Sequence, residues 1–375
     1  MNLEEWLNQV VEKKASDLFI TVGVPPMMKI DGKLVTLSGE NLTAAQTKEI
    51  VFGMLSDEQQ AQFSKTKEFN FAIQQENFGR FRVSAFQQRS VYGAVLRRIE
   101  STIPTLTQLH MPETLSSFAL AQRGLVLVVG ATGAGKSSTL AAMIGNRNKN
   151  TKGHIISIED PIEFVHNHEG CIITQREIGI DTDSFEVALK NTLRQAPDVI
   201  LIGEIRSLET MNYAISFAET GHLCLATLHA NNANQALDRI ASFFPHEILK
   251  QLWMDLSLNL KAIIAQQLIP IKDSNGRVPA VEILINTPVI SEHIRKGEIN
   301  EVKKFMIKSG ELGMQTFDQS LFKLYTDGKI SYESALKYAD SENDVRLMIK
   351  LLPGGASVSA PEGLTMLKDQ DEFPN

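Results

Sequence analysis

Residues 130–138 combine the residue types and the spacing of a phosphate-binding loop. Residues 130–137 match the pattern G-x-x-x-x-G-K-[ST] at every fixed position. In such a loop, backbone N–H groups and a helix N-terminus surround the β-phosphate of a nucleotide. We expect Lys136 to reach the β- and γ-phosphates and Ser137 to ligate Mg²⁺. The expected nucleotide-binding residues are Gly130, Ala131, Thr132, Gly133, Ala134, Gly135, Lys136, Ser137 and Ser138.

The flanking sequence favours a nucleotide site over a chance match in a glycine-rich turn. An apolar run at residues 125–129 predicts a buried strand, and residues 137–147 predict a helix. A strand, a glycine-rich turn and a helix in this order are the context that the motif requires. The sequence therefore predicts a site for ATP or GTP.

Carboxylates follow other expected strands. Glu159, Asp160 and Glu163 come just after the strand expected at residues 154–158, and hydrolysis needs one carboxylate to orient and deprotonate the attacking water. An acidic turn that is merely solvated is the alternative. Glu204 follows the apolar residues 199–202, which is the Walker B arrangement, in which the acid holds Mg²⁺ directly or through water.

Histidines bracket the strand expected at residues 223–227. The end of this strand should approach the γ-phosphate, where a histidine such as His222 or His229 can sense the terminal phosphate by hydrogen bonding. A lone histidine at a strand end is more often structural.

The elements that must position these residues form more than one domain, because 375 residues suggest two or three. Strand-like runs and a helix predict a small α+β domain over residues 1–103, and strands that alternate with helices predict a mostly parallel sheet in residues 104–351. We expect a flexible polar tail over 352–375. The expected elements are strands at 18–22, 27–30, 78–86, 93–99, 125–129, 154–158, 199–202 and 223–227, helices at 44–55 and 137–147, and a chiefly helical region over 247–351 with helices at 248–264, 316–325 and 332–339.

Composition narrows the class of protein. The net charge of −7 and the pI near 5.7 argue against a nucleic-acid-binding protein. The cysteines, Cys171 and Cys224, are far apart and fit a reducing cytosol as core residues. The acidic N-terminus and the lack of a long apolar stretch predict a cytoplasmic protein without direct membrane insertion.

Taken together, the ordered motifs at 130–137, 158–163, 199–204 and 220–229 resemble those of the secretion ATPases of the type II and type IV pilus class. The likeness covers about residues 1–350 and is greatest to the twitching-motility retraction motors of the PilT/PilU family. The resemblance implies a PAS-like N-terminal domain, a RecA-like ATPase domain and a homohexameric ring that uses ATP and Mg²⁺. It further implies partnership with an inner-membrane platform protein, and hence a peripheral location at the inner membrane.

The resemblance also assigns roles to residues. It implies that Glu163 is the catalytic glutamate, that Glu204 is the Walker B glutamate and a Mg²⁺ ligand with Ser137, and that His229 contacts the γ-phosphate. Arginines alternate along the strands at 78–86 and 93–99, so Arg82 and Arg97 can present guanidinium groups to phosphates, as the family's N-terminal-domain arginines do; solvated strand faces are the alternative. Other arginines near the motifs could serve a ring interface or couple the domains. These are Arg194, Arg206 and Arg239.

Residues 311–321 resemble a retraction-type signature, which favours retraction over pilus extension. Residues 292–307 lack the A-I-R-N-L-I-R-E sequence of principal retraction motors, and Ala196 replaces an expected acid. Both departures point to the accessory PilU-like branch, which depends on a PilT-like principal motor. The alternatives are a nucleotide-dependent accessory subunit that generates no force alone, a type II secretion or pilus extension ATPase, a DNA-transport ATPase of the same superfamily and a small-molecule kinase. The acidic balance and the signature disfavour DNA transport, and the carboxylate and histidine motifs disfavour a kinase.

Overall fold

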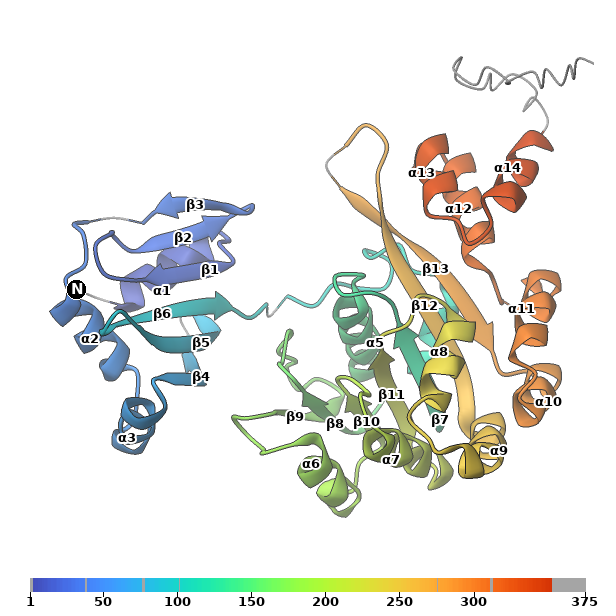
Figure 1. The fold of residues 1–375 in the computed structure, drawn as a ribbon, viewed down its shortest axis with the longest axis horizontal. Helices are drawn as coiled ribbons and strands as arrows, with labels where there is room; N and C mark the ends of the chain where they lie inside the picture. The colour runs from blue at the N-terminus through green and yellow to red at the C-terminus, as the bar shows by residue number, and fades with distance from the viewer. Residues whose placement is uncertain are drawn as a thin grey trace, which may run out of the picture.

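A computed structural model describes residues 3–37, 39–75, 78–100, 102–274, 276–310 and 313–352. The expected tail lies outside the described residues except for Leu352. Within the described part of the chain, two sheets are built from consecutive stretches of sequence (Figure 1).

The first sheet is six-stranded and antiparallel, in the order β3-β2-β1-β6-β5-β4. Alternate residues of its strands, such as Phe81 and Val83, are fully buried beneath the helices. The helix α2 starts at a capping box formed by Thr43 and Gln46. The elements are α1 (Leu3–Glu12), β1 (Asp17–Ile20), β2 (Met27–Ile30), β3 (Lys33–Thr36), α2 (Ala44–Gly53), α3 (Asp57–Thr66), β4 (Glu68–Gln75), β5 (Gly79–Gln88) and β6 (Val91–Arg98).

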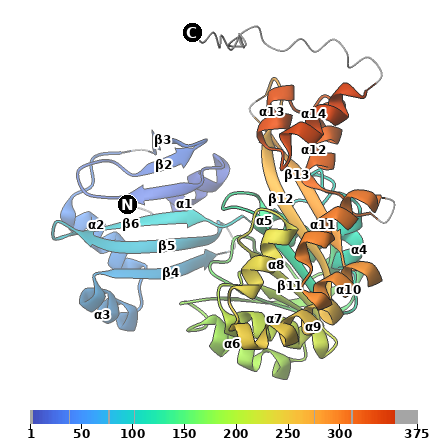
Figure 2. The same ribbon diagram turned by 45° about the vertical axis from the view of Figure 1, so that its right-hand side comes forward.

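The second sheet is seven-stranded, in the order β13-β12-β7-β11-β10-β8-β9, and only β13 runs antiparallel to its neighbour. Along β7, Leu125 and Leu127 belong to one buried cluster and Val126 and Val128 to another, so both faces of the sheet are covered. Figure 2 shows the helices around this sheet. The expected α/β fold with a mostly parallel sheet is confirmed. The elements are α4 (Thr114–Ala119), β7 (Gly124–Val129), α5 (Lys136–Asn150), β8 (Gly153–Glu159), β9 (Cys171–Glu177), α6 (Phe185–Thr192), η1 (Leu193–Gln195), β10 (Val199–Ile202), α7 (Leu208–Glu219), β11 (Leu223–Leu228), α8 (Ala233–Ala241), η2 (His246–Ile248), α9 (Leu249–Asn259), β12 (Leu260–Pro270) and β13 (Arg277–Ile285).

The expectation of a helix over residues 248–264 is wrong. The helix α9 ends at Asn259, and the chain continues at Leu260 as β12, which pairs with β7 and with β13. A short apolar run fits a buried strand as well as a helix, and the β-branched Ile263 and Ile264 favour the strand. The region 247–351 is therefore helical only in part. Its C-terminal helices are α10 (Pro288–Lys296), α11 (Ile299–Lys308), α12 (Phe317–Thr326), α13 (Tyr332–Lys337) and α14 (Glu342–Lys350).

Both cysteines are buried in the second sheet, as expected. Cys224 lies fully buried in β11, where burial raises the pKa of its thiol far above the ordinary value. Cys171 begins β9, and its Sγ lies 3.4 Å from the Thr151 hydroxyl. Among the helices that the structure describes, none combines the length and apolarity that crossing a bilayer requires.

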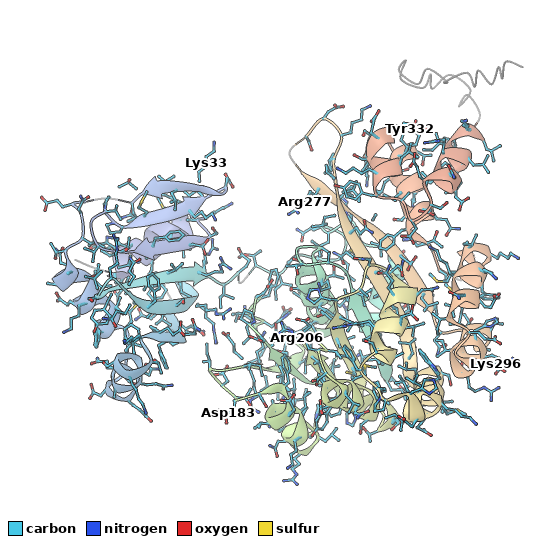
Figure 3. The ribbon with its side chains drawn as sticks, in the orientation of Figure 1. Lys33, Asp183, Arg206, Arg277, Lys296 and Tyr332 are labelled. Carbon is cyan, nitrogen blue, oxygen red and sulfur yellow. The ribbon has the colours of Figure 1, made fainter. Side chains whose placement is uncertain are left out.

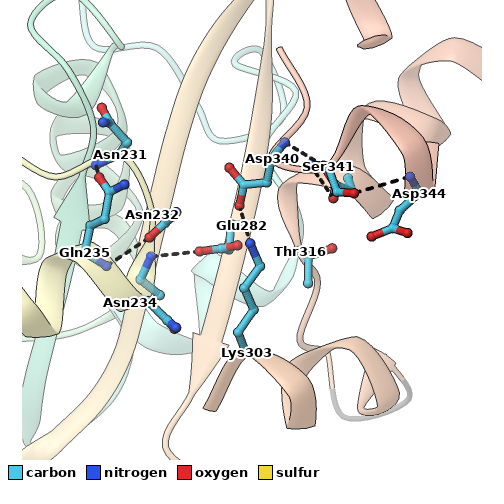
Figure 4. A network of polar contacts seen from close by, with 12 residues as sticks. Asn231, Asn232, Asn234, Gln235, Glu282, Lys303, Thr316, Asp340, Ser341 and Asp344 are labelled. Carbon is cyan, nitrogen blue, oxygen red and sulfur yellow. Dashed lines mark hydrogen bonds and ion pairs between the residues drawn. The ribbon is translucent and has the colours of Figure 1, made fainter. Parts of the chain in front are cut away.

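A polar network ties the C-terminal helices to β13 and α8 (Figure 4). Glu282 on β13 is buried and accepts a hydrogen bond of 2.8 Å from the Ala233 N–H at the start of α8. Lys303 pairs with Asp340 at 2.7 Å, and the Asp318 carboxylate accepts from the Asp340 N–H. Asp318 belongs to the signature expected at 311–321, so this part of the signature anchors α12 to the segment before α14; Glu311 and Leu312 lie outside the described residues.

Replacing Glu282 by Gln is expected to remove a pH-dependent loss of stability. Burial raises the pKa of Glu282 to about 7, although the Ala233 N–H and Lys303 act in the opposite direction. Between pH 4.5 and 7 the unfolded chain releases this proton while the folded chain retains it, so the free energy of unfolding falls as the pH rises. The fall is on the order of 3 kcal/mol and levels off above pH 7.

The glutamine keeps an oxygen for the Ala233 N–H but cannot ionise. Urea unfolding at pH 5 and pH 8.5 should therefore show Glu282→Gln close to wild type at the lower pH and more stable at the higher. The matched control is Glu219→Gln, which makes the same substitution at an exposed position. This variant should leave the dependence of unfolding free energy on pH unchanged. Equal pH profiles for Glu282→Gln and wild type would contradict the prediction.

Candidate active site

The topology of the second sheet gathers the sequence motifs at one edge. The parallel strands β7, β8, β10 and β11 all end there, and the loops beyond those ends carry the phosphate-binding loop, the carboxylates of 159–163, Glu204 and His229. Because β11 lies between β7 and β10, His229 stands between the phosphate-binding loop and Glu204. These residues line one pocket of about 550 Å³.

The phosphate-binding loop leads directly into a helix, as expected. Helix α5 begins at Lys136, and Gly135 before it has a φ of 89°, which a glycine adopts without strain. The Lys136 Nζ donates to the carbonyl oxygens of Gly130 at 2.8 Å and of Ala131 at 3.1 Å. Burial lowers the pKa of Lys136, while the charges of Glu204 and Glu163 act to raise it. A nucleotide phosphate would thus offer this ammonium a better partner than the loop's own carbonyls.

Gln266 on β12 supports the phosphate-binding loop, although no motif in the sequence indicated this residue. Its side-chain amide is buried, donates to the Ala134 carbonyl at 2.7 Å and accepts from the Thr139 hydroxyl at 2.8 Å. A Cβ atom on Gly130 would lie 2.6 Å from the Gln266 carbonyl oxygen. The glycine is therefore required because β12 approaches the loop closely.

The acidic loop after β8 presents carboxylates with different surroundings. Glu163 is exposed and lines the pocket. Glu159 accepts a hydrogen bond of 2.7 Å from the Ser157 hydroxyl, and burial raises the pKa of Glu159 to about 7. Glu163 and Asp160 are accordingly the exposed carboxylates of this loop, whereas Glu159 is partly buried.

The Glu204 carboxylate contacts two side chains, those of Arg206 and His229. One carboxylate oxygen lies 2.6 Å from the Arg206 guanidinium and the other 3.1 Å from the His229 Nε2. Arg206 also lies 3.5 Å from Asp160, so it bridges the Walker B glutamate to the acidic loop. Arg206 also lines the pocket. Figure 3 labels it on the part of the chain that holds the second sheet.

His222 lies away from the site. It precedes β11, whereas His229 follows it, so the strand separates them by roughly 20 Å. The His222 Nδ1 lies 3.0 Å from the Thr220 hydroxyl and 3.2 Å from the Phe217 carbonyl oxygen. His222 is therefore a structural histidine at the start of the strand, and only His229 lies at the site.

The two histidines are expected to respond differently to alanine substitution. A hydrogen bond to a charged group contributes about 1.5–3 kcal/mol, so His229→Ala should lower kcat for ATP hydrolysis by about 10- to 100-fold. The matched control His222→Ala should keep kcat within about twofold and lose only about 1 kcal/mol of unfolding free energy. Steady-state hydrolysis and urea unfolding of both variants provide the measurement, and equal losses of kcat would contradict the assignment.

The other expected arginines do not line the pocket. Arg97 is 71% exposed at its side chain and pairs with Asp17 at 2.8 Å. Arg82 on β5 lies directly opposite Arg97 on β6 in the strand register. The Arg82 Nε lies 3.9 Å from a carboxylate oxygen of Glu177. Arg194 is exposed on η1, and Arg239 lies over the ring of Phe243.

One arginine that the sequence analysis missed, Arg277, does line the pocket. It opens β13, within the region 247–351 that was expected to be chiefly helical, so no sequence signal connected it with the phosphate-binding loop. Arg277 is labelled in Figure 3.

The donor set fits Mg²⁺ bound with a nucleotide. Ser137 and Glu204 line the same pocket, and the described residues hold no cluster of three or more His, Cys, Asp or Glu side chains that could bind a metal by itself. Mg²⁺ typically takes one or two protein ligands together with phosphate oxygens and waters, so a sparse set suits it.

Together, the parallel sheet and the lined pocket define a P-loop ATPase. Residues 1–316 match the family model described as type II/IV secretion system protein. The chain is 63% identical to the type IV pilus ATPase PilU of Pseudomonas aeruginosa, over 94% of this chain and 92% of that protein, and 41% identical to the retraction ATPase PilT of the same organism, over 90% and 98%. A crystal structure of the pilus retraction motor PilT with bound ADP superposes with a TM-score of 0.85 at 37% identity, covering 92% of this chain and 98% of that one.

The chain therefore belongs to the type II/IV secretion system protein family, and it is a close homologue of the PilU and PilT ATPases. The resemblance noted in the sequence is confirmed.

Proposed function

We propose that this chain is an ATP-hydrolysing motor that powers or assists the retraction of type IV pili, as a PilU-like partner of a PilT-like principal motor. The observation that supports this most strongly is the 63% identity to PilU over nearly the whole chain, with an intact phosphate-binding loop, Glu163, Glu204 and His229 around one pocket. Identity to PilT is lower, at 41%.

In the proposed reaction, the loop 130–138 binds the phosphates of ATP, and Lys136 moves from the loop carbonyls to the β- and γ-phosphates. Glu163 orients the attacking water and takes its proton, and His229 contacts the γ-phosphate. Ser137 and Glu204 would hold Mg²⁺, which neutralises charge that develops on the phosphates. Arg206 and Arg277 line the same pocket, and their guanidinium groups would meet phosphate charge there as well.

The unit of function that we propose is a homohexamer in the cytoplasm, held at the inner membrane by a platform protein of the pilus machine. Its domains are residues 1–103, PAS-like, and 104–351, RecA-like with its C-terminal helices. Arg82 and Arg97 lie on the first domain outside the pocket of their own chain, so closure of that domain or a neighbouring subunit would have to bring them to the phosphates.

Steady-state ATP hydrolysis by the purified chain, alone and mixed with a PilT-like motor, tests the proposal, with Lys136→Ala as the blank. Hydrolysis that depends on Lys136, either alone or in the mixture, is expected. Activity alone would indicate a self-sufficient ATPase, and activity only in the mixture would indicate a dependent one. Equal rates for wild type and Lys136→Ala under both conditions would overturn the proposal.

A further inference from the structure

Two arginines of the first sheet meet one glutamate of the second. Arg80 and Arg82 on β5 reach Glu177, the last residue of β9. The Arg80 Nη2 lies 3.5 Å from one carboxylate oxygen of Glu177, and the Arg82 Nε lies 3.9 Å from the other. Glu177 is only 1% exposed, whereas the side chains of Arg80 and Arg82 are 18% and 35% exposed, so the contact buries the glutamate between the two parts of the chain.

The same glutamate touches the loop that carries Glu163. The backbone N–H of Ile162, the residue before Glu163, is near enough to the Glu177 carboxylate to favour its ionised form, and so lowers the pKa of Glu177. Its backbone lies in register with Glu159, where that loop begins. Glu177 does not line the nucleotide pocket, so its influence on the reaction must pass through its neighbours.

The far side of the Glu163 loop is also held from the first sheet. Glu100, which follows β6, forms a β-bridge with Phe164 and accepts a hydrogen bond of 3.2 Å from the Val165 N–H. Glu163 is thus flanked on both sides by contacts that depend on where the first sheet stands. A movement of the first sheet relative to the second can therefore displace Glu163 through the contact at Glu177 or through the contact at Glu100.

The joint at Glu177 is incompletely satisfied. The Oε2 of Glu177 and the Nε of Arg80 are both buried without a hydrogen-bond partner among the residues that the structure describes. Unpaired buried polar atoms cost free energy, so a small movement that brings the guanidinium onto the carboxylate is favoured. Burial raises the pKa of Glu177, and the charges of Arg80 and Arg82 lower it, which shows that both arginines favour the ionised carboxylate.

We propose that Glu177 is a positioning residue for Glu163. When the first domain moves relative to the ATPase domain, Arg80 and the neighbouring Arg82 act on Glu177, and Glu177 in turn determines the position of Glu163. This inference rests on the proposed role of Glu163. In the cycle, engagement of the arginines on Glu177 holds the Ile162 N–H and so the Glu163 carboxylate in position, and separation of the domains releases it.

Glu177→Gln tests this, because the amide oxygen can still accept from the Ile162 N–H while the charge that attracts the arginines is gone. A misplacement of about 1 Å costs up to about 100-fold, so kcat should fall by about 10- to 100-fold. The KM for ATP and the affinity for a fluorescent ATP analogue should stay within about threefold. Arg80→Gln should behave alike, and the double variant should be no slower than the slower single variant.

Asp340→Asn is the matched control, since it removes the carboxylate of a partly buried ion pair with Lys303, and neither residue lines the pocket. Its kcat should be that of wild type. Glu163→Gln separates the two proposals. If Glu163→Gln hydrolyses ATP at the wild-type rate, the proposed role of Glu163 fails, and the inference that rests on it fails as well. If Glu163→Gln is inactive but Glu177→Gln retains wild-type kcat, or if the losses of Glu177→Gln and Arg80→Gln multiply, the inference alone is overturned. Should Glu177→Gln not fold, Arg80→Gln carries the test, and wild-type kcat in that variant overturns the inference.

Discussion

Glu163→Gln is expected to lower kcat for ATP hydrolysis by about 10³-fold while ATP binding remains within a few-fold of wild type. The amide matches the carboxylate in shape but cannot take a proton from water, and general-base catalysis contributes about 10²- to 10⁴-fold. Glu163 is exposed within the pocket, so the substitution leaves no buried group unpaired. A loss confined to kcat identifies an interaction made in the transition state.

Single-turnover hydrolysis with a fluorescent-analogue titration would measure both quantities. Glu169→Gln is a suitable control, because Glu169 is an exposed acid a few residues further along that does not line the nucleotide pocket. Its rate should be that of wild type. A Glu163→Gln variant whose KM rises while kcat is retained would show that Glu163 binds the substrate rather than activates water.

Gly130→Ala is expected to destroy the phosphate-binding loop without altering any functional group. The added Cβ would lie 2.6 Å from the Gln266 carbonyl oxygen and 2.9 Å from the Ala134 Cβ, which forces the loop and β12 apart. Such overpacking costs about 1–3 kcal/mol of unfolding free energy. It would also misplace the N–H groups that face the phosphates, so ATP affinity should fall by about 100-fold.

Urea unfolding and nucleotide titration of Gly130→Ala provide the measurement. Gly221→Ala is the control for an added methyl group at a turn glycine: φ there is +96°, and no atom of the described part of the chain lies within 4 Å of the new Cβ. That variant should lose about 1 kcal/mol through backbone strain but bind ATP normally. Wild-type ATP affinity in Gly130→Ala would contradict the close approach of β12.

The sequence predicted the parts of the fold whose signals are local. The phosphate-binding loop, the strand before it and helix α5 follow from a pattern with fixed spacing, and β10 and β11 follow from short apolar runs between turns. The hairpin β12–β13 was missed, because the apolar residues after Asn259 continue the pattern of the helix before them. Its pairing partner, β7, lies more than a hundred residues earlier in the chain, and local periodicity carries no information on that contact.

The site was predictable to the same extent. The motif residues Lys136, Glu163, Glu204 and His229 share one pocket, as their positions at strand ends implied. Gln266 was not predictable, since its partners at Ala134 and Thr139 are distant in sequence.

The charged residues between motifs were harder to place. Arg206 follows Glu204 by two residues, but in the sequence it looked equivalent to Arg194 and Arg239. In the structure, Arg206 contacts Glu204, whereas Arg239 lies over the ring of Phe243.

The burial of both native thiols makes the unmodified chain suited to site-specific labelling. Maleimide dyes need accessible thiols, and Cys171 and Cys224 are both buried in the folded state. Single cysteines introduced at exposed positions of the two sheets' domains, such as Lys33 and Asp183 (Figure 3), would therefore take up a donor and an acceptor dye without removal of the native residues. Energy transfer between the dyes would then follow the separation of the two domains during turnover.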